Sequence, residues 1–244
     1  MLFELKNDQK SLVQDNEPEL DLLQMLRREN RYLLKTFFPI FNNIGFGIVR
    51  GRSIPTKRGI INGYTSNSYE AFTLVTLKDN TNHRFLPSAG SVLKLEFDGG
   101  IDKDSKFLNS YFHFNTIYPL TNFLYCKFQF VGKGINYFKG MVPKSRYSWF
   151  GGNSKLRGYN EQAFTSPQYQ ISSFELGYKP EINFEATIFL DIGSDKLDIY
   201  KNNYIGYGFG ITQMNDESII KLEYGLSSFK IKEGMLHIKW ISRI

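Results

Sequence analysis

Apolar and polar residues alternate with a period of two along most of this 244-residue chain. From about Tyr32 onward, turn residues interrupt the alternation every 8 to 15 positions or so, as in antiparallel strands joined in sequence. The pattern predicts about ten strands and no helix in this part of the chain. The predicted strands are residues 36–50, 68–78, 90–98, 106–117, 122–132, 169–178, 182–193, 203–213, 217–226 and 235–242.

Each predicted strand has one apolar face and one polar face. Two architectures fit this alternation: a soluble sandwich or barrel with its apolar face inward, and a membrane barrel with its apolar face toward lipid. The predicted strands run to about ten residues, the length that a tilted strand needs to cross a bilayer, whereas strands in soluble proteins average about five or six. In the membrane barrel, parity places Leu222, Tyr224, Leu236, Ile238 and Trp240 outside and Lys221, Glu223, His237 and Lys239 in the lumen.

The predicted connections alternate between short and long. The short turns are 118–120, 179–181 and 213–217, and the longer connections are 99–105, 132–167, 194–202 and 227–234. Short turns at one rim and long loops at the other are typical of membrane barrels. We therefore predict an all-β, antiparallel up-and-down transmembrane β-barrel, or the C-terminal part of one, with a long loop folded into its lumen.

The first 31 residues depart from this pattern. Acidic residues flank Pro18, and leucines then recur at helical spacing as far as Leu26, just before two arginines. We expect one short amphipathic helix there. This gives an N-terminal polar and helical segment of residues 1–31, followed by a β-barrel domain of residues 32–244.

Composition excludes several other classes. Mean hydropathy is −0.33 and 41% of residues are hydrophobic, and no stretch approaches the run of about 18 apolar residues that a transmembrane helix requires. The net charge of +6 is spread along the chain, which disfavours nucleic acid as a partner. A single cysteine, Cys126, cannot form an internal disulfide. The first ten residues carry charges where a signal peptide would need an apolar core.

No pattern for catalysis or metal binding emerges. His83, His113 and His237 lie in separate segments without ligand spacing, and no nucleophile is paired with a base. We expect neither an enzyme nor a cofactor or metal site. The alternate glycines from Gly206 to Gly210 lie inside a predicted strand rather than before a helix, so they suit the close approach of a folded-back loop.

The longest connection mixes glycines, which permit unusual backbone conformations, with large side chains that a solvated loop does not need. Arg157 lies at its centre and presents a planar fork of five donors suited to a carboxylate. The candidate loop residues are Gly151, Gly152, Leu156, Arg157, Gly158, Tyr159 and Glu161. The simpler interpretation is an exposed glycine-rich hairpin loop with one solvated arginine.

The predicted strand 182–193 offers a partner for this loop. Parity places Phe189 and Asp191 together on the polar face. Asp191 could pair with Arg157 in a bidentate, charge-assisted contact, with an aromatic ring alongside. In the alternative interpretation, Asp191 begins a turn and Phe189 is a register irregularity.

Several motifs, in this order, resemble the C-terminal barrels of the BamA/TamA-type outer-membrane assembly superfamily, the bacterial surface antigen family. They are the loop motif 150–159 with Glu161, the segment 174–177, the strand motif 188–193 and the closing pattern 208–238. The resemblance extends from about Arg84 to the end of the chain. It implies five strands after the arginine loop, and a loop seated on the wall at Glu175, Phe189, Asp191 and Gly193.

The resemblance also implies a function. It indicates an outer-membrane barrel that inserts, assembles or translocates other proteins, without a cofactor or covalent catalysis, by strand exchange at a weak seam. The implied partners are the outer-membrane bilayer, unfolded outer-membrane protein clients or a secreted substrate, and accessory assembly proteins. Two alternatives stay open: a passive outer-membrane pore or structural barrel, and a soluble β-sandwich binding protein.

Overall fold

The computed structural model describes residues 2–13, 23–37, 43–83, 86–103, 105–153, 155–195, 203–215, 218–227 and 233–242. The main strands are β1 (Leu2–Val13), β2 (Leu23–Thr36), β3 (Asn43–Pro55), β4 (Asn67–Asp79), β5 (Gly90–Asp102), β6 (Ser105–Pro119), β7 (Leu124–Tyr137), β10 (Gln168–Glu181), β11 (Phe184–Ser194), β12 (Asn203–Met214), β13 (Ser218–Leu226) and β14 (Met235–Ser242). The smaller elements are α1 (Lys57–Ile61), a 3-10 helix (Lys144–Arg146), β8 (Ser148–Phe150) and β9 (Phe164–Ser166).

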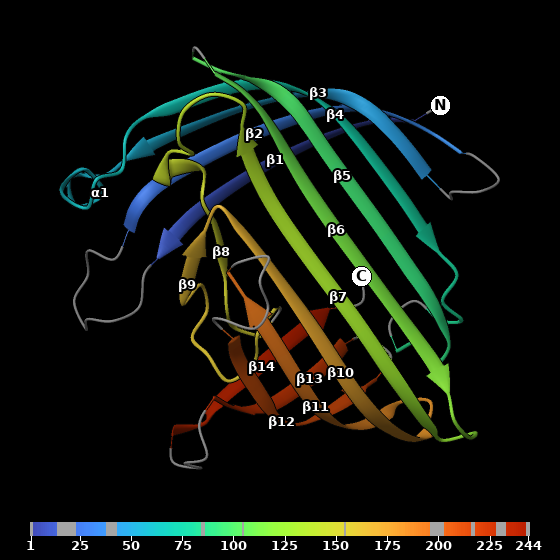
Figure 1. The fold of residues 1–244 in the computed structure, drawn as a ribbon. Helices are drawn as coiled ribbons and strands as arrows, with labels where there is room; N and C mark the ends of the chain where they lie inside the picture. Colours follow the sequence, from blue (N-terminus) through green and yellow to red (C-terminus); the bar gives the residue numbers. More distant parts are fainter. Residues whose placement is uncertain are drawn as a thin grey trace.

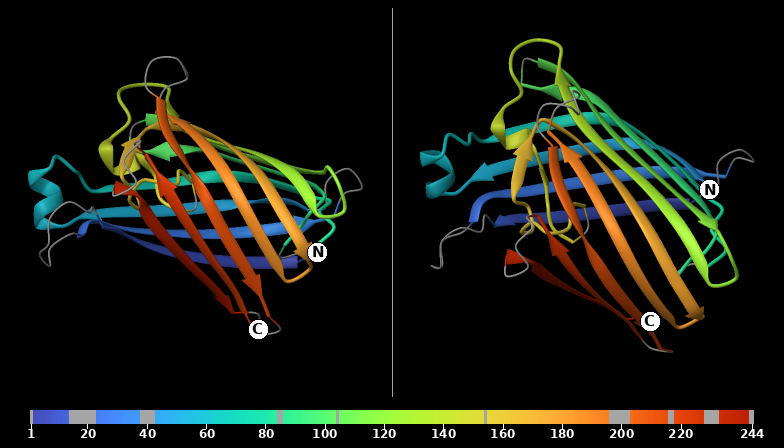
Figure 2. Two further views of the ribbon diagram at one scale, coloured as in Figure 1. Left: turned by 90° about the horizontal axis from the view of Figure 1, so that it is seen from below. Right: turned by 60° about the horizontal axis from the view of Figure 1, so that its bottom comes forward.

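The twelve main strands form one antiparallel sheet in which neighbours in the sequence are neighbours in space, except that β7 pairs with β10. β8 and β9 form a separate two-stranded sheet within the connection between β7 and β10. The large sheet curls into most of a barrel wall with tilted strands (Figures 1 and 2). Within the described residues, β1 pairs with β2 alone and β14 with β13 alone, so the wall is open between these two edges.

The two faces of the wall are the reverse of those of a soluble protein. Large apolar side chains point outward, with Phe72 77% and Trp240 75% exposed, while Asp98 and Glu223 are each only 2% exposed on the inner face. Leu222, Leu236 and Ile238 are exposed and His237 is buried, as parity predicted. A single curved sheet with this polarity is an up-and-down barrel wall, and the β-sandwich alternative is wrong. No helix in the described part of the chain is long and apolar enough to span a membrane.

Connections are short at one rim and long at the other, as predicted, except for 80–89 and the connection between β5 and β6. The rim that we call the turn rim has two residues between β10 and β11 and three between β12 and β13, and the opposite loop rim carries the long connection 138–167. The turn rim also carries the ten-residue connection 80–89. The predicted loop 99–105 is wrong, because β5 continues to Asp102. A Cβ on Gly100 would lie 2.1 Å from the carbonyl oxygen of Glu70, so this glycine serves strand packing rather than a turn.

The amphipathic helix predicted after Pro18 is wrong over residues 23–28, which belong to β2; residues 14–22 lie outside the described part of the chain. β2 pairs along its length with β1 and β3, and this pairing outweighs a local helical spacing of leucines. β2 also continues through the domain boundary predicted at residue 31, where Arg31 pairs with Lys6 and Val49. The ten predicted strands correspond to β3 to β7 and β10 to β14, so β1 and β2 are the two that were missed.

The connection 138–167 folds into the curve of the sheet (Figure 1). Its side chains Trp149, Phe150 and Leu156 are 7%, 1% and 0% exposed. Phe150 and Leu156 form a cluster with Val131 of β7 and with Tyr169 and Ile171 of β10. The lumen therefore has an apolar core of its own, and the interpretation of this loop as an exposed hairpin is wrong.

Candidate functional site

The guanidinium of Arg157 lies inside the wall and faces Asp191 of β11. Arg157 donates to this carboxylate three times: its backbone N to Oδ2 at 2.9 Å, Nε to Oδ2 at 2.8 Å and Nη2 to Oδ1 at 2.6 Å. Asp191 is fully buried and Arg157 is 5% exposed. The bidentate geometry matches the planar fork to the carboxylate, as the sequence predicted for this pair.

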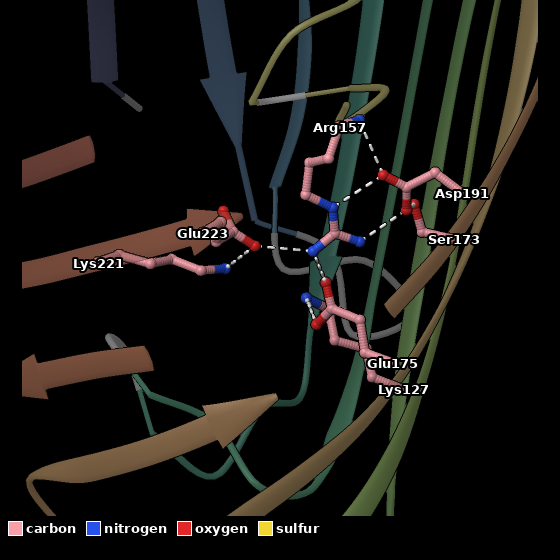
Figure 3. A network of polar contacts seen from close by, with 7 residues as sticks. All are labelled: Lys127, Arg157, Ser173, Glu175, Asp191, Lys221 and Glu223. Carbon is pink, nitrogen blue, oxygen red and sulfur yellow. Dashed lines mark hydrogen bonds and ion pairs between the residues drawn. The ribbon is translucent and has the colours of Figure 1, made fainter. Parts of the chain in front are cut away.

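Two more carboxylates complete the contacts of the arginine. Nη1 donates to Oε1 of Glu175 on β10 at 2.6 Å and to Oε1 of Glu223 on β13 at 2.8 Å (Figure 3). Lysines then pair with these acids: Lys127 of β7 with Glu175 at 3.0 Å, and Lys221 with Glu223 at 3.0 Å. Three cations and three carboxylates thus balance in one network, which removes the cost of an unpaired buried charge.

Neighbouring side chains hold the central pair in position. The guanidinium carbon of Arg157 lies 3.6 Å from the ring centroid of Phe189, a cation–π contact. Ser173 of β10 donates its hydroxyl to Oδ1 of Asp191 at 2.6 Å (Figure 3). Burial alone lowers the pKa of Arg157, but the hydrogen bonds and charge of Asp191, with the other two acids, raise it above its ordinary value. The arginine is therefore a permanent cation.

Glycines let the loop backbone lie directly against the wall. A Cβ on Gly206 of β12 would lie 1.8 Å from the carbonyl oxygen of Arg157, and one on Gly225 of β13 would lie 2.4 Å from the backbone N of Gly158. Gly158 itself has φ of +88° and lies against the backbone of Leu226. Of the three alternate glycines predicted on β12, only Gly206 lies against the folded-back loop. Gly208 and Gly210 lie against the carbonyl oxygen of Tyr224 and the side chain of Glu223 on β13.

The remaining predicted loop residues support this tip. Gly151 and Gly152 have φ of +112° and +87°, and Glu161 accepts a hydrogen bond from the backbone N of Asn153 at 2.7 Å. The side chain of Leu156 packs against Gly193, on which a Cβ would lie 3.3 Å from the leucine methyl groups. Tyr159 donates its hydroxyl to the carbonyl of Ile205 at 3.2 Å. The structure therefore brings together all of the predicted loop and wall residues.

Sequence reasoning did not assign four members of this network to the site: Lys127, Ser173, Lys221 and Glu223. The available signal was parity, which placed Lys221 and Glu223 in the lumen. Lys127 and Ser173 could be found only from strand register, since Glu175 pairs with Lys127 on one side and Ser173 with Asp191 on the other.

The arrangement suits anchoring of the loop. Each acid of the network is already paired, and among the described residues no group of His, Cys, Asp and Glu could hold a metal ion. A polar cavity of about 350 Å³ adjoins the network and is lined by Arg157, Glu175 and Glu223 among others. The site fixes a long loop to β10, β11 and β13 on the inner face of the wall.

Comparison with known protein families identifies this architecture. The model of the Omp85 superfamily domain matches residues 62–212, more than half of the chain. The chain belongs to the Omp85 superfamily. This confirms the predicted resemblance to the assembly barrels of the BamA/TamA type.

Solved structures support the Omp85 fold. The chain is similar to BamA from Haemophilus ducreyi lacking POTRA domains 1–3, with a TM-score of 0.68 and 13% identity over 89% of this chain and 54% of that one. It is also similar to CdiB from Acinetobacter baumannii, with a TM-score of 0.60 and 12% identity over 90% of this chain and 42% of that one. The chain thus spans about half the length of these proteins. No curated protein matches it.

Proposed function

We propose that this Omp85 chain inserts or translocates other proteins at the bacterial outer membrane by offering a sheet edge to an incoming strand. The observation that carries the proposal is the edge strand β14, which pairs with β13 alone among the described residues. An unpaired edge presents a row of N–H and C=O groups that can template another strand. In lipid, such an edge is costly unless it is paired, which favours exchange with a client strand.

The side chains of β14 suit this role. Leu236, Ile238 and Trp240 are 62%, 67% and 75% exposed. They alternate with His237, which is buried, and with Lys239, which lines the cavity beside the Arg157 network. A client strand added at this edge would continue the apolar outer face of the wall. The Arg157 network meanwhile holds β10, β11 and β13 to the loop, so the wall behind the edge keeps its shape while the edge exchanges partners.

Site-directed cross-linking tests the proposal. In a Cys126→Ser background, Ile238→Cys places a thiol on the outer face of β14, and Leu222→Cys places one on its cross-strand partner in β13. We expect Ile238→Cys to cross-link to alternate positions of one strand of an unfolded outer-membrane client during its folding into vesicles. The matched Leu222→Cys variant is one strand inside the sheet and should stay unlinked.

A second measurement separates assembly from the alternative of a passive pore. Vesicles that contain the Omp85 chain should fold the client faster than empty vesicles, as followed by the heat-dependent band shift of the client on gels. Steady single-channel conductance with no acceleration, together with equal cross-linking at 222 and 238, would show a passive barrel and refute templating at β14.

A further inference from the structure

The outer face of β2 and β3 carries a group of arginines, whereas most of the outer face of the wall presents apolar side chains. On this face Leu34, Phe46 and Ile48 are 47%, 54% and 47% exposed. Toward the loop rim, the outward positions change to Arg28, Arg50 and Arg52, which are all exposed. We call these three residues the arginine patch. Charges on the lipid face of a barrel destabilise it, least near the interfaces and most at the bilayer midplane, so a compensating anion would stabilise this patch.

Strand register adds a second source of destabilisation. Arg28 lies directly opposite Arg52 in the β2–β3 pair, and like charges placed directly opposite each other destabilise a sheet. Arg50 is compensated by Glu70 of β4, 3.0 Å away. From residue 25 onward, where the structure describes side chains, no ion pair includes Arg28 or Arg52, and the β1 residue in register with Arg28 is Gln9. The two arginines therefore share the outward side of the β2–β3 pair without an acidic partner among those side chains.

Apolar surface lies on both sides of the arginine pair. Leu26 and Ile54, the next outward pair toward the loop rim, are 52% and 43% exposed, and Tyr32 lies on the other side at 38%. α1 follows β3 directly and exposes Ile61 by 83%. A free hydrated anion would gain nothing from these contacts. A ligand with both a phosphate group and an apolar body would use the whole surface.

We propose that Arg28 and Arg52 bind the phosphate group of an anionic membrane lipid on the outside of the wall. Two planar forks on neighbouring strands suit the bidentate contacts that guanidinium groups make with phosphate oxygens. The lipid's acyl chains would cover the apolar positions on either side of the pair. This inference rests on the membrane location of the proposed function, and it concerns a different surface from the β14 edge.

Native mass spectrometry of the folded chain in a neutral detergent tests the site. The probes are phosphatidic acid, phosphatidylcholine with the same acyl chains, and inorganic phosphate. We expect adducts with phosphatidic acid at concentrations where phosphatidylcholine forms few. The Arg28→Gln/Arg52→Gln variant should bind phosphatidic acid at least about tenfold more weakly, since the loss of one charge-assisted hydrogen bond weakens binding by roughly that factor.

The matched control is Lys106→Gln/Lys139→Gln, which removes two exposed cations at the same rim but away from the patch. It should bind phosphatidic acid like the parent chain. Arg28→Lys/Arg52→Lys keeps the charge and loses the forks, so it should bind with intermediate affinity. This variant and the two single glutamine variants also keep the test decisive if the double glutamine variant does not fold.

Three results would overturn the proposal: equal adducts with both lipids, equal loss in the patch and control variants, or displacement of phosphatidic acid by inorganic phosphate at similar concentration. The last result would assign the pair to a free anion. The heat-dependent band shift of the parent chain separates this failure from that of the proposed function. If the chain folds in detergent but shows no lipid preference, only the lipid site is refuted. If the chain folds and stays soluble without detergent, both the lipid site and the membrane location of the proposed function are refuted.

Discussion

Replacing Arg157 with alanine should destabilise the barrel much more than replacing an exposed cation at the loop rim. The change removes all side-chain contacts of the guanidinium with three carboxylates, of which Asp191 is fully buried and Glu175 and Glu223 are 8% and 2% exposed. Breaking a buried ion pair by removing one partner costs about 3 to 5 kcal/mol. The adjoining cavity of about 350 Å³ admits water that screens the remaining acids, so we expect the lower end, about 3 kcal/mol.

Equilibrium unfolding in urea, followed by the band shift of the folded barrel, measures this loss as a change in the free energy of unfolding. Asp191→Ala should cost a similar amount, and the Arg157→Ala/Asp191→Ala double variant should be less than additive because the two residues share one interaction. The matched control is Lys139→Ala, which removes an exposed cation just after β7 and should change the free energy of unfolding by about 0.5 kcal/mol or less. Additive losses, or a loss at Arg157 no larger than that at Lys139, would refute the reasoning.

Two further predictions concern the loop seat and the second ion cluster. Gly206→Ala should displace the loop, because its Cβ would lie 1.8 Å from the carbonyl oxygen of Arg157; limited proteolysis should cut the loop faster than in Gly99→Ala, where nothing lies within 4 Å of the added Cβ. Arg31→Ala breaks a separate network around Asp98, which Arg31 contacts at 3.0 Å and 3.2 Å, so its loss in urea unfolding should add to that of Arg157→Ala. Strong non-additivity there would mean that the two networks are coupled across the lumen.

Most of the wall could be predicted from the period-two pattern because each of these strands has one face toward the apolar exterior. β1 and β2 were missed for a physical reason. Their sequences are rich in charge, and the leucines before Arg27 also fit a helical spacing, so only pairing with β3 decides the conformation. The segment at Gly99 and Gly100 was mistaken for a turn because glycine also serves where two strands come unusually close.

For the candidate site, parity predicts which face of a strand a side chain occupies but not which side chains meet. Parity places Asp191 and Glu223 on the inner face of their strands, and the loop composition identifies Arg157. Which acids meet the guanidinium depends on the stagger of β10, β11 and β13 relative to one another. A single sequence does not specify that stagger, so Glu223 was placed in the lumen but not in the site.

The contacts of the loop explain how a wall with an open seam keeps its curvature. The stem of the loop touches the first half of the sheet: Arg27 of β2 donates to the carbonyl of Tyr147 at 2.8 Å, and the guanidinium of Arg146 lies 3.4 Å from the ring centroid of Tyr69 on β4. The tip touches the second half through Arg157 and Asp191. One segment therefore braces both halves from inside, and the edges β1 and β14 do not have to pair with each other to hold the wall curved. In a barrel without such a brace, the curvature of the wall depends on closure of the sheet.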